Sequence, residues 1–174
     1  MLIKHRLMLL RHAKSARPYG VPDRERPLAG RGRKAASDIG AYMMREGLVP
    51  DLILVSPARR ALETLRLVRD WLPGDIPCRR SADVYEASGL GILDVIRAVG
   101  SGALTLLIIG HNPGMANAAS LIVAGGEPKA VKDMREKFPT AGLAVIELAL
   151  GWNDVVEGSG YLERFITPKA VAPE

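Results

Sequence analysis

The side chains best suited to chemistry in this sequence are two arginines and two histidines, namely Arg11, His12, Arg60 and His111. Each of them belongs to a short polar segment that begins directly after an apolar run. The three apolar runs are Leu7–Leu10, Leu52–Val55 and Leu104–Ile109. Such runs are typical of buried parallel strands, and ligands bind at the carboxyl ends of those strands. We therefore expect the four side chains to converge at one edge of a sheet.

A phosphoryl group is the ligand that fits this combination of side chains. A guanidinium group is a planar fork of donors that matches phosphate oxygens and stays charged at any working pH. A neutral imidazole can attack phosphorus and form a covalent phosphohistidine, while the other groups stabilise charge on the equatorial oxygens. A helix that starts near Pro113 would add backbone N–H groups and a positive dipole end. The set therefore favours phosphoryl chemistry.

A metal site is the first alternative for a pair of histidines, and the sequence disfavours it. The chain has only three histidines and one cysteine, with no close spacing of histidine and carboxylate. A catalytic zinc ion needs a third protein ligand. Two guanidinium groups beside the site would also repel the cation. We therefore expect no metal.

The elements that must position these residues alternate between strand and helix patterns. The expected strands are Arg6–Leu10, Leu52–Val55, Leu104–Ile109, Leu143–Leu148 and Tyr161–Ile166. The expected helices are Gly32–Glu46, Pro57–Leu72, Leu90–Val99 and a helix with Asn112 as N-cap and Pro113 at N1 that continues to Ile122. This order predicts an α/β three-layer sandwich with a mainly parallel central sheet flanked by helices, and the late strands add an antiparallel edge strand. Since these elements use most of the 174 residues, we expect a single domain over residues 1–174 with no inserted lid domain.

The composition limits the classes of partner. The chain is 48% hydrophobic and 25% charged, with a net charge of +5, which is typical of a globular protein with an anionic partner. The cations are scattered and only 5% of the residues are aromatic, so nucleic acid is disfavoured. We see no membrane span and no signal peptide. The single Cys78 fits a reducing cytoplasm. We expect a cytoplasmic protein and leave its oligomeric state open.

The segments LRHAKS, SPARRALET and IGHNPGM resemble the signature of the histidine phosphatase superfamily. Three further segments, RPLAGRG, VYEAS and KFPTAGLAVIEL, extend the resemblance over nearly the whole chain and make it most similar to the small phosphohistidine phosphatase branch. The resemblance implies that His12 is the nucleophile. It implies that Arg11 and Arg60 bind the phosphate, with Arg60 preferred over Arg59 because it directly precedes Ala-x-Glu-Thr. It further implies that His111 donates a hydrogen bond to the phosphate, and it implies no metal and no organic cofactor.

Two positions depart from the patterns of that superfamily. Ala13 stands where the first motif usually has Gly. Asn112 stands where the acid phosphatase branch has an Asp that donates a proton. Glu86 is the candidate acid by its position, as in the mutase branch, and a surface or structural carboxylate is the alternative reading of this residue.

Three other charged residues near the motifs need an interpretation. Lys14 and Arg17 are candidate substrate-binding residues at the rim of the pocket, and solvated loop charge is the alternative for both. Glu63 lies one turn after Arg60 on the same predicted helix face, so we interpret it as an ion-pair partner that holds Arg60.

Together these features predict a phosphatase that acts on phosphohistidine in a protein through a covalent phosphohistidine intermediate. Without a lid, the pocket would be open and rimmed by cations, which suits a bulky phosphorylated protein. A phosphoramidate also needs less acid catalysis, because its leaving imidazole can be protonated near neutral pH. The alternatives are the same chemistry on a small phosphorylated molecule, such as a phosphate ester, and a non-catalytic phosphate-binding module.

Overall fold

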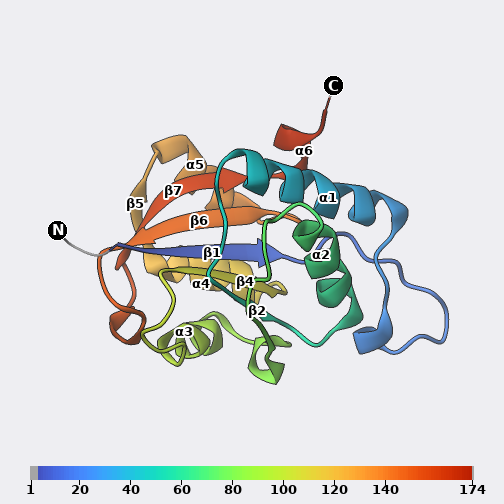
Figure 1. The fold of residues 1–174 in the computed structure, drawn as a ribbon, viewed down its shortest axis with the longest axis horizontal. Helices are drawn as coiled ribbons and strands as arrows, with labels where there is room; N and C mark the ends of the chain where they lie inside the picture. The colour runs from blue at the N-terminus through green and yellow to red at the C-terminus, as the bar shows by residue number, and fades with distance from the viewer. Residues whose placement is uncertain (1–3, 174) are drawn as a thin grey trace.

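A computed structural model describes residues 4–173, which form a seven-stranded sheet with helices on both faces (Figure 1). The strands are β1 (His5–Arg11), β2 (Leu52–Val55), β3 (Cys78–Arg80), β4 (Thr105–Gly110), β5 (Val123–Gly126), β6 (Leu143–Leu148) and β7 (Gly160–Ile166). The helices are α1 (Gly30–Arg45), α2 (Arg59–Arg69), α3 (Gly89–Arg97), α4 (Gly114–Ile122), α5 (Pro128–Glu136) and α6 (Pro168–Val171), with the short 3-10 helices η1 (Asp23–Glu25), η2 (Ala82–Val84) and η3 (Trp152–Asp154). None of the helices in the described part of the chain is long and apolar enough to cross a membrane.

The strand order is β3-β2-β4-β1-β6-β7-β5. β4 pairs in parallel with both β1 and β2, and β2 pairs in parallel with β3. β6 runs antiparallel to β1 and to β7, and β5 completes the sheet parallel to β7. The predicted α/β class, the mainly parallel sheet and the antiparallel late pair are therefore confirmed.

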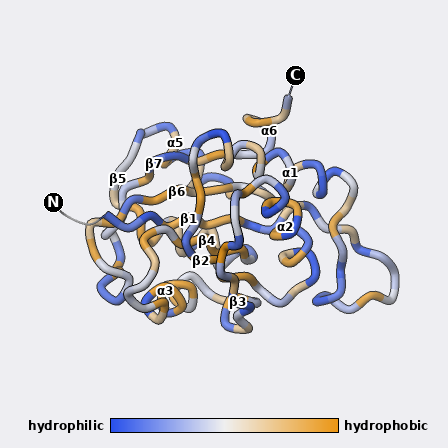
Figure 2. The backbone as a smooth tube through the Cα atoms, viewed as in Figure 1, coloured by the Kyte–Doolittle hydropathy of each residue, from blue (hydrophilic) through white to orange (hydrophobic). Residues whose placement is uncertain are grey.

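The strands alternate their side chains between two apolar layers, as a period of two requires. Leu7 and Leu9 pack in the layer of α3, α4 and α5, whereas Met8 and Leu10 pack in the layer of α1 and α2. All four side chains are fully buried. In Figure 2, hydrophilic residues gather in the loops and helices at the outside of the molecule. Burial on both faces explains why β1 reads as a continuous apolar run.

All four predicted helix starts differ from the structure by one or two residues, and α1 begins at Gly30 rather than Gly32 and α3 at Gly89 rather than Leu90. α2 begins at Arg59 rather than Pro57, because the Ser56 side chain accepts a hydrogen bond from the Ala58 N–H and forms a turn first. α4 begins at Gly114, so Asn112 is not its N-cap. The Asn112 side chain still accepts a hydrogen bond from the Ala116 N–H at 3.3 Å, but Asn112 lies one residue before the N-cap, which is Pro113.

Several elements were not expected from the sequence. β3 is a three-residue strand whose side chains are all exposed, and β5 ends in two glycines. Neither segment has the apolar alternation that predicts a strand. α5 buries only Met134, so its apolar stripe is too thin to reveal the helix in the sequence.

The carboxyl ends of β2, β4 and β1 lie side by side at one edge of the sheet. Arg11 faces Gly110 across one pair and Val55 faces Ile109 across the other. The His12 N–H donates to the Gly110 carbonyl at 2.9 Å, which continues the ladder past the end of β1. The segments that follow the three strands therefore begin at the same level, as the sequence predicted.

Candidate active site

His12 lies directly after β1 and is only 7% exposed. Its Nδ1 is 2.8 Å from the Ala13 carbonyl oxygen. Because a carbonyl can only accept, Nδ1 carries the proton and donates it. The Nε2 atom therefore holds a lone pair, which accepts a hydrogen bond from Arg60 Nε at 3.3 Å. A neutral imidazole with this tautomer has the nucleophilic nitrogen that attack on phosphorus requires.

The surroundings of His12 keep its imidazole neutral. Burial lowers the pKa of His12 to about 3, and the nearby positive charges of Arg60 and Arg11 act in the same direction, whereas the Ala13 carbonyl opposes them. Burial and the charge of Arg60 likewise lower the pKa of His111 to about 4. Both rings are therefore uncharged near neutral pH.

Arg60 reaches the site from the first turn of α2 and is buried. Its Nη1 donates to the Asp23 carbonyl at 2.7 Å, and its Nη2 donates to Asp23 Oδ2 at 3.0 Å. The prediction that Glu63 forms an ion pair with Arg60 is wrong. Glu63 accepts hydrogen bonds from Arg59 Nε and from the Leu28 N–H, both at 2.8 Å. The helix places Glu63 four residues after Arg59, which is the favoured spacing for an ion pair.

Asp23 connects several groups around Arg60. In addition to Arg60, its carboxylate accepts from Tyr85 Oη at 2.6 Å and from Arg26 Nη1 at 2.9 Å. The Tyr85 hydrogen bond, with Arg26 and Arg60, holds the pKa of Asp23 well below its ordinary value. This carboxylate therefore stays ionised and does not act as a proton donor near neutral pH.

His111 follows β4 and lies beside His12, with ring centroids 5.0 Å apart. The edge of the Tyr85 ring contacts it, with centroids 5.4 Å apart. His111 Nε2 is 2.7 Å from Ser56 Oγ, while its Nδ1 is buried and has no partner among residues 4–173. Ser56 Oγ already accepts the Ala58 N–H. A hydroxyl that accepts there can donate its proton to Nε2, which leaves the proton of His111 on Nδ1.

Arg11 ends β1 and turns its guanidinium toward the loop before β6. Its Nη1 donates to the Phe138 carbonyl at 3.0 Å, and its Nε is buried without a partner in the described chain. Burial lowers the pKa of Arg11. Its positive charge also lowers the pKa of His12 and of His111, and it directly precedes His12 in the chain.

The remaining predicted residues lie further out. Lys14 is exposed and lines a cavity together with Arg11. Arg17 is exposed in the loop before η1. Glu86 is also exposed and adopts a φ of 54°, in the left-handed region that few non-glycine residues occupy. It follows Tyr85, which contacts His111. The structure thus brings His12, Arg60 and His111 together, with Arg11 beside them, and leaves the role of Glu86 a prediction.

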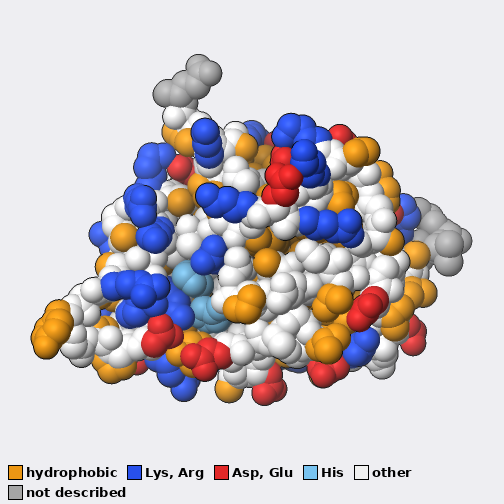
Figure 3. All heavy atoms as spheres, turned by 180° about the vertical axis from the view of Figure 1, so that it is seen from behind, with side chains coloured by type: hydrophobic (Ala, Val, Ile, Leu, Met, Phe, Trp, Pro, Cys, Tyr) orange, Lys and Arg blue, Asp and Glu red, His pale blue; other side chains and the backbone are white. Residues whose placement is uncertain are grey.

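The face that carries the site is strongly basic. Figure 3 shows histidine side chains with Lys and Arg side chains gathered next to them on one face. Among residues 4–173, no group of three or more His, Cys, Asp and Glu side chains could hold a metal ion. The arrangement instead presents guanidinium donors and a neutral imidazole, which is a setting for an anionic group.

Sequence reasoning missed three residues of this arrangement: Asp23, Ser56 and Tyr85. Ser56 opens the segment SPARR, so its position after β2 was a usable signal. Asp23 is one charge among many in a loop rich in Arg and Pro, and nothing in its sequence neighbourhood pairs it with Arg60.

No family model matches the chain. It is 35% identical over 162 residues to an uncharacterized protein of Mycobacterium tuberculosis, a match that covers 92% of this chain and 100% of the relative. An uncharacterized protein of Mycobacterium leprae is 33% identical over 165 residues, again with 92% and 100% coverage.

Three solved structures with the same fold carry the name SixA. A Nakamurella multipartitia protein assigned as phosphohistidine phosphatase SixA is 26% identical with a TM-score of 0.82, covering 95% of this chain and 96% of its own. An Agrobacterium tumefaciens protein with the same assignment is 28% identical with a TM-score of 0.80, covering 94% and 98%. The protein histidine phosphatase SixA complexed with tungstate shares the fold at 20% identity and a TM-score of 0.78, covering 96% and 99%.

Proposed function

Because the chain belongs to the histidine phosphatase superfamily, in its small phosphohistidine phosphatase branch, and is a hydrolase, we propose that it removes the phosphoryl group from phosphohistidine on a protein. The reaction passes through a covalent intermediate on His12. The observation that carries this proposal is the state of His12: a buried neutral imidazole whose Nδ1 proton is held by the Ala13 carbonyl and whose Nε2 faces Arg60.

In the first step, the Nε2 lone pair of His12 attacks phosphorus. The new N–P bond forms as the N–P bond of the substrate breaks, and the electron pair leaves with the substrate imidazole, which takes up a proton from solvent. Arg11 and Arg60 neutralise charge on the phosphoryl oxygens, and His111 donates its Nδ1 proton to one of them as a hydrogen bond. In the second step, water attacks phosphorus, the N–P bond to His12 breaks and its electron pair returns to Nε2. Inorganic phosphate leaves with the protons of the water, so His12 is again neutral.

Neither of the carboxylates Asp23 and Glu86 near the site is placed to donate a proton, and this fits a phosphohistidine substrate. The ionised Asp23 does not supply a proton, and the exposed Glu86 makes no hydrogen bond to the site in the described residues. An alkoxide leaving group would need such a donor, whereas an imidazole takes its proton near neutral pH. The site is therefore better suited to a phosphoramidate than to a phosphate ester.

We also propose that residues 1–174 form one domain without a lid. The longest connection in the described chain is the loop between β1 and α1, and it packs η1 against the Arg60 side of the site. This arrangement supports a site that stays accessible to a phosphorylated protein.

Rapid-quench trapping tests the intermediate. The wild-type chain is mixed with a protein that carries labelled phosphohistidine, and bound label is counted before hydrolysis is complete. We expect label on the wild type and on a His5→Ala control, and none on His12→Ala. Label that is absent, or unchanged in His12→Ala, contradicts the mechanism.

A substrate comparison tests the target. The phosphohistidine protein is compared with phosphoserine and with sugar phosphates at equal concentration. We expect the phosphohistidine protein to turn over fastest, and faster turnover of the small esters would overturn the assignment of a protein substrate.

A further inference from the structure

A basic cavity of about 420 Å³ lies next to the catalytic cluster. Its lining residues are Arg11, Lys14, Arg31, Ala35, Lys137, Pro139, Thr140 and Pro168. They come from four separate places in the fold: the end of β1 and the loop after it, the first turns of α1, the segment from α5 to β6, and the start of α6. The cavity therefore exists only in the folded chain.

Three of the four cations that line this cavity have no side-chain partner in the described residues, and the fourth, Arg11, donates only to the Phe138 carbonyl. Four of its lining residues are Arg or Lys, and no carboxylate is among them. Within residues 4–173, Lys14, Arg31 and Lys137 form no ion pair and donate no side-chain hydrogen bond. Neighbouring arginines do have partners: Arg33 donates to the Leu28 carbonyl and Arg59 to Glu63. Clustered, uncompensated cations favour an anionic ligand.

Arg11 connects this cavity to the site of the reaction. It lines the cavity, it directly precedes His12 in the chain, and its buried Nε has no partner in the described residues. An anion in the cavity would therefore lie beside Arg11, the residue directly before the proposed nucleophile His12.

The preference for an anionic ligand does not extend into the hollow that adjoins the cavity on the side of Lys137. A second hollow of about 520 Å³ shares Lys137, Pro139, Thr140 and Pro168 with the cavity, but Asp133 and Glu136 also line it. The negative charges of Asp133 and Glu136 would repel an anionic group bound in that second hollow. Only the part that adjoins Arg11 is purely basic.

We propose that this cavity is a specificity subsite that binds the carboxylate of an Asp or Glu residue beside the phosphohistidine of the protein substrate. The inference rests on the proposed function, because it takes the reacting group to be phosphohistidine. Charge complementarity selects an acidic neighbour, and because Arg11 lines the cavity and directly precedes His12, we expect that neighbour close to the phosphorylated side chain.

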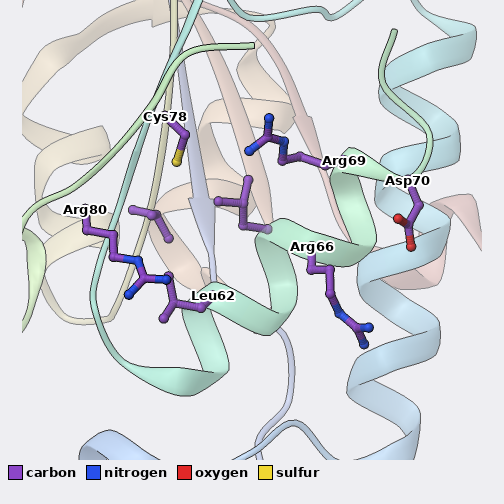
Figure 4. Close-up of a pocket in the computed structure, with 8 residues that line it drawn as sticks. Leu62, Arg66, Arg69, Asp70, Cys78 and Arg80 are labelled. Carbon is purple, nitrogen blue, oxygen red and sulfur yellow. The ribbon is translucent and has the colours of Figure 1, made fainter. Parts of the chain in front are cut away.

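A second basic cavity supplies a matched control. It is lined by Arg66, Arg69, Arg80, Asp70 and Cys78 over an apolar floor, and none of the predicted site residues contributes to it (Figure 4). Arg66 and Arg80 are exposed. The double variant R66Q/R80Q therefore removes two positive charges, as R31Q/K137Q does, without changing the proposed subsite.

The test compares two phosphohistidine peptides that differ only in Glu or Gln on both sides of the phosphorylated residue. The measured quantity is the ratio of kcat/KM for the Glu peptide to kcat/KM for the Gln peptide at low ionic strength. We expect a ratio of about five in the wild type and in R66Q/R80Q, and a ratio near one in R31Q/K137Q. The preference should shrink at high salt because added ions screen exposed charges.

A binding experiment distinguishes a failure of the proposed function from a failure of the proposed subsite. Peptides with a non-hydrolysable phosphonate analogue of phosphohistidine, again with Glu or Gln neighbours, are titrated against each variant. A wild type that hydrolyses neither peptide overturns the proposed function, and the Kd ratio then still decides the subsite. A ratio of one in the wild type, or a preference that survives in R31Q/K137Q, overturns the subsite. Loss of the preference in that variant alone supports it.

Discussion

Asp23 and Arg60 are joined by hydrogen bonds beside His12, although they are 37 residues apart in the chain. The guanidinium of Arg60 donates both to the backbone carbonyl and to the carboxylate of Asp23, at 2.7 and 3.0 Å. These two bonds fix the plane of the guanidinium, and its Nε points at His12 as a consequence. Asp23 therefore holds the Arg60 guanidinium in one orientation, and we predict that this orientation is the one that binds phosphate.

Replacing Asp23 with Asn should reduce activity more than stability. The amide cannot neutralise Arg60, so the guanidinium loses part of its fixed orientation, and we expect kcat/KM to fall about tenfold. The melting temperature should change little because the ion pair is partly exposed. Steady-state kinetics and thermal melts measure both, with Asp83→Asn as the control for an exposed Asp. An Asp23→Asn enzyme as active as wild type would refute the positioning role, whereas recovery in Asp23→Glu would support it.

Ser56 should set the tautomer of His111. Without its hydroxyl, Nε2 of His111 loses the donor that holds the proton on Nδ1, and the hydrogen bond to phosphate weakens. We expect Ser56→Ala to lower kcat about tenfold. The ¹⁵N chemical shifts of the imidazole report the tautomer directly, and Ser101→Ala serves as an exposed control. Unchanged ¹⁵N shifts in Ser56→Ala would be incompatible with this role.

The stability of the fold should decrease as the pH falls below about 6.5, the ordinary pKa of His. Burial lowers the pKa of His12 to about 3 and that of His111 to about 4. Between these values and 6.5, the unfolded chain binds protons that the folded chain does not, so the free energy of unfolding decreases with falling pH. Each histidine contributes about 1.4 kcal/mol per pH unit.

Urea unfolding at pH 7, 6 and 5 measures this slope. His12→Gln removes one of the two titrating groups, so its slope between pH 6 and 5 should be smaller than that of the wild type by the contribution of one histidine. Equal slopes in the two proteins would mean that His12 does not resist protonation in the fold.

Oxyanions should inhibit the enzyme and chelators should not. Vanadate mimics the five-coordinate phosphorus of the transition state, and the guanidinium groups of Arg11 and Arg60 bind such a species more tightly than the substrate. We expect competitive inhibition by vanadate at low concentration and full activity after EDTA treatment. Arg60→Gln should weaken the vanadate inhibition. Strong inhibition by EDTA would instead indicate an essential metal.

Gly32 fixes the loop that follows His12. A Cβ atom on Gly32 would lie 2.0 Å from the Lys14 carbonyl oxygen, whereas a Cβ on Gly30 in the same helix would meet its first neighbour at 3.9 Å. We expect Gly32→Ala to cost about 3 kcal/mol of folding free energy. Gly30→Ala should change it by less than about 1 kcal/mol. Chemical denaturation of both variants checks this, and similar values for the two would show that the loop yields to the added methyl group.

The sequence predicted the sheet and the residues at its edge for one physical reason. A strand buried on both faces must be apolar throughout, so β1, β2 and β4 could be recognised, and the first polar residues after them had to lie at their carboxyl ends. This placed His12 and His111 correctly although they are far apart in the chain. The motif SPARRALET likewise identified Arg60, which the structure places beside His12.

The contacts made by loops, and by elements with few buried side chains, were decided by the tertiary structure alone. The loop after β1 has no periodicity, so the pairing of Asp23 with Arg60 depends on how η1 packs against α2, and local helix spacing suggested Glu63 instead. The basic cavity combines Lys14, Arg31 and Lys137 from segments that are far apart in the chain and meet only in the folded structure. Hydrophobic periodicity therefore predicted the scaffold and the positions of the candidate site residues, whereas the partners that orient those residues depend on long-range packing, which has no local pattern in the sequence.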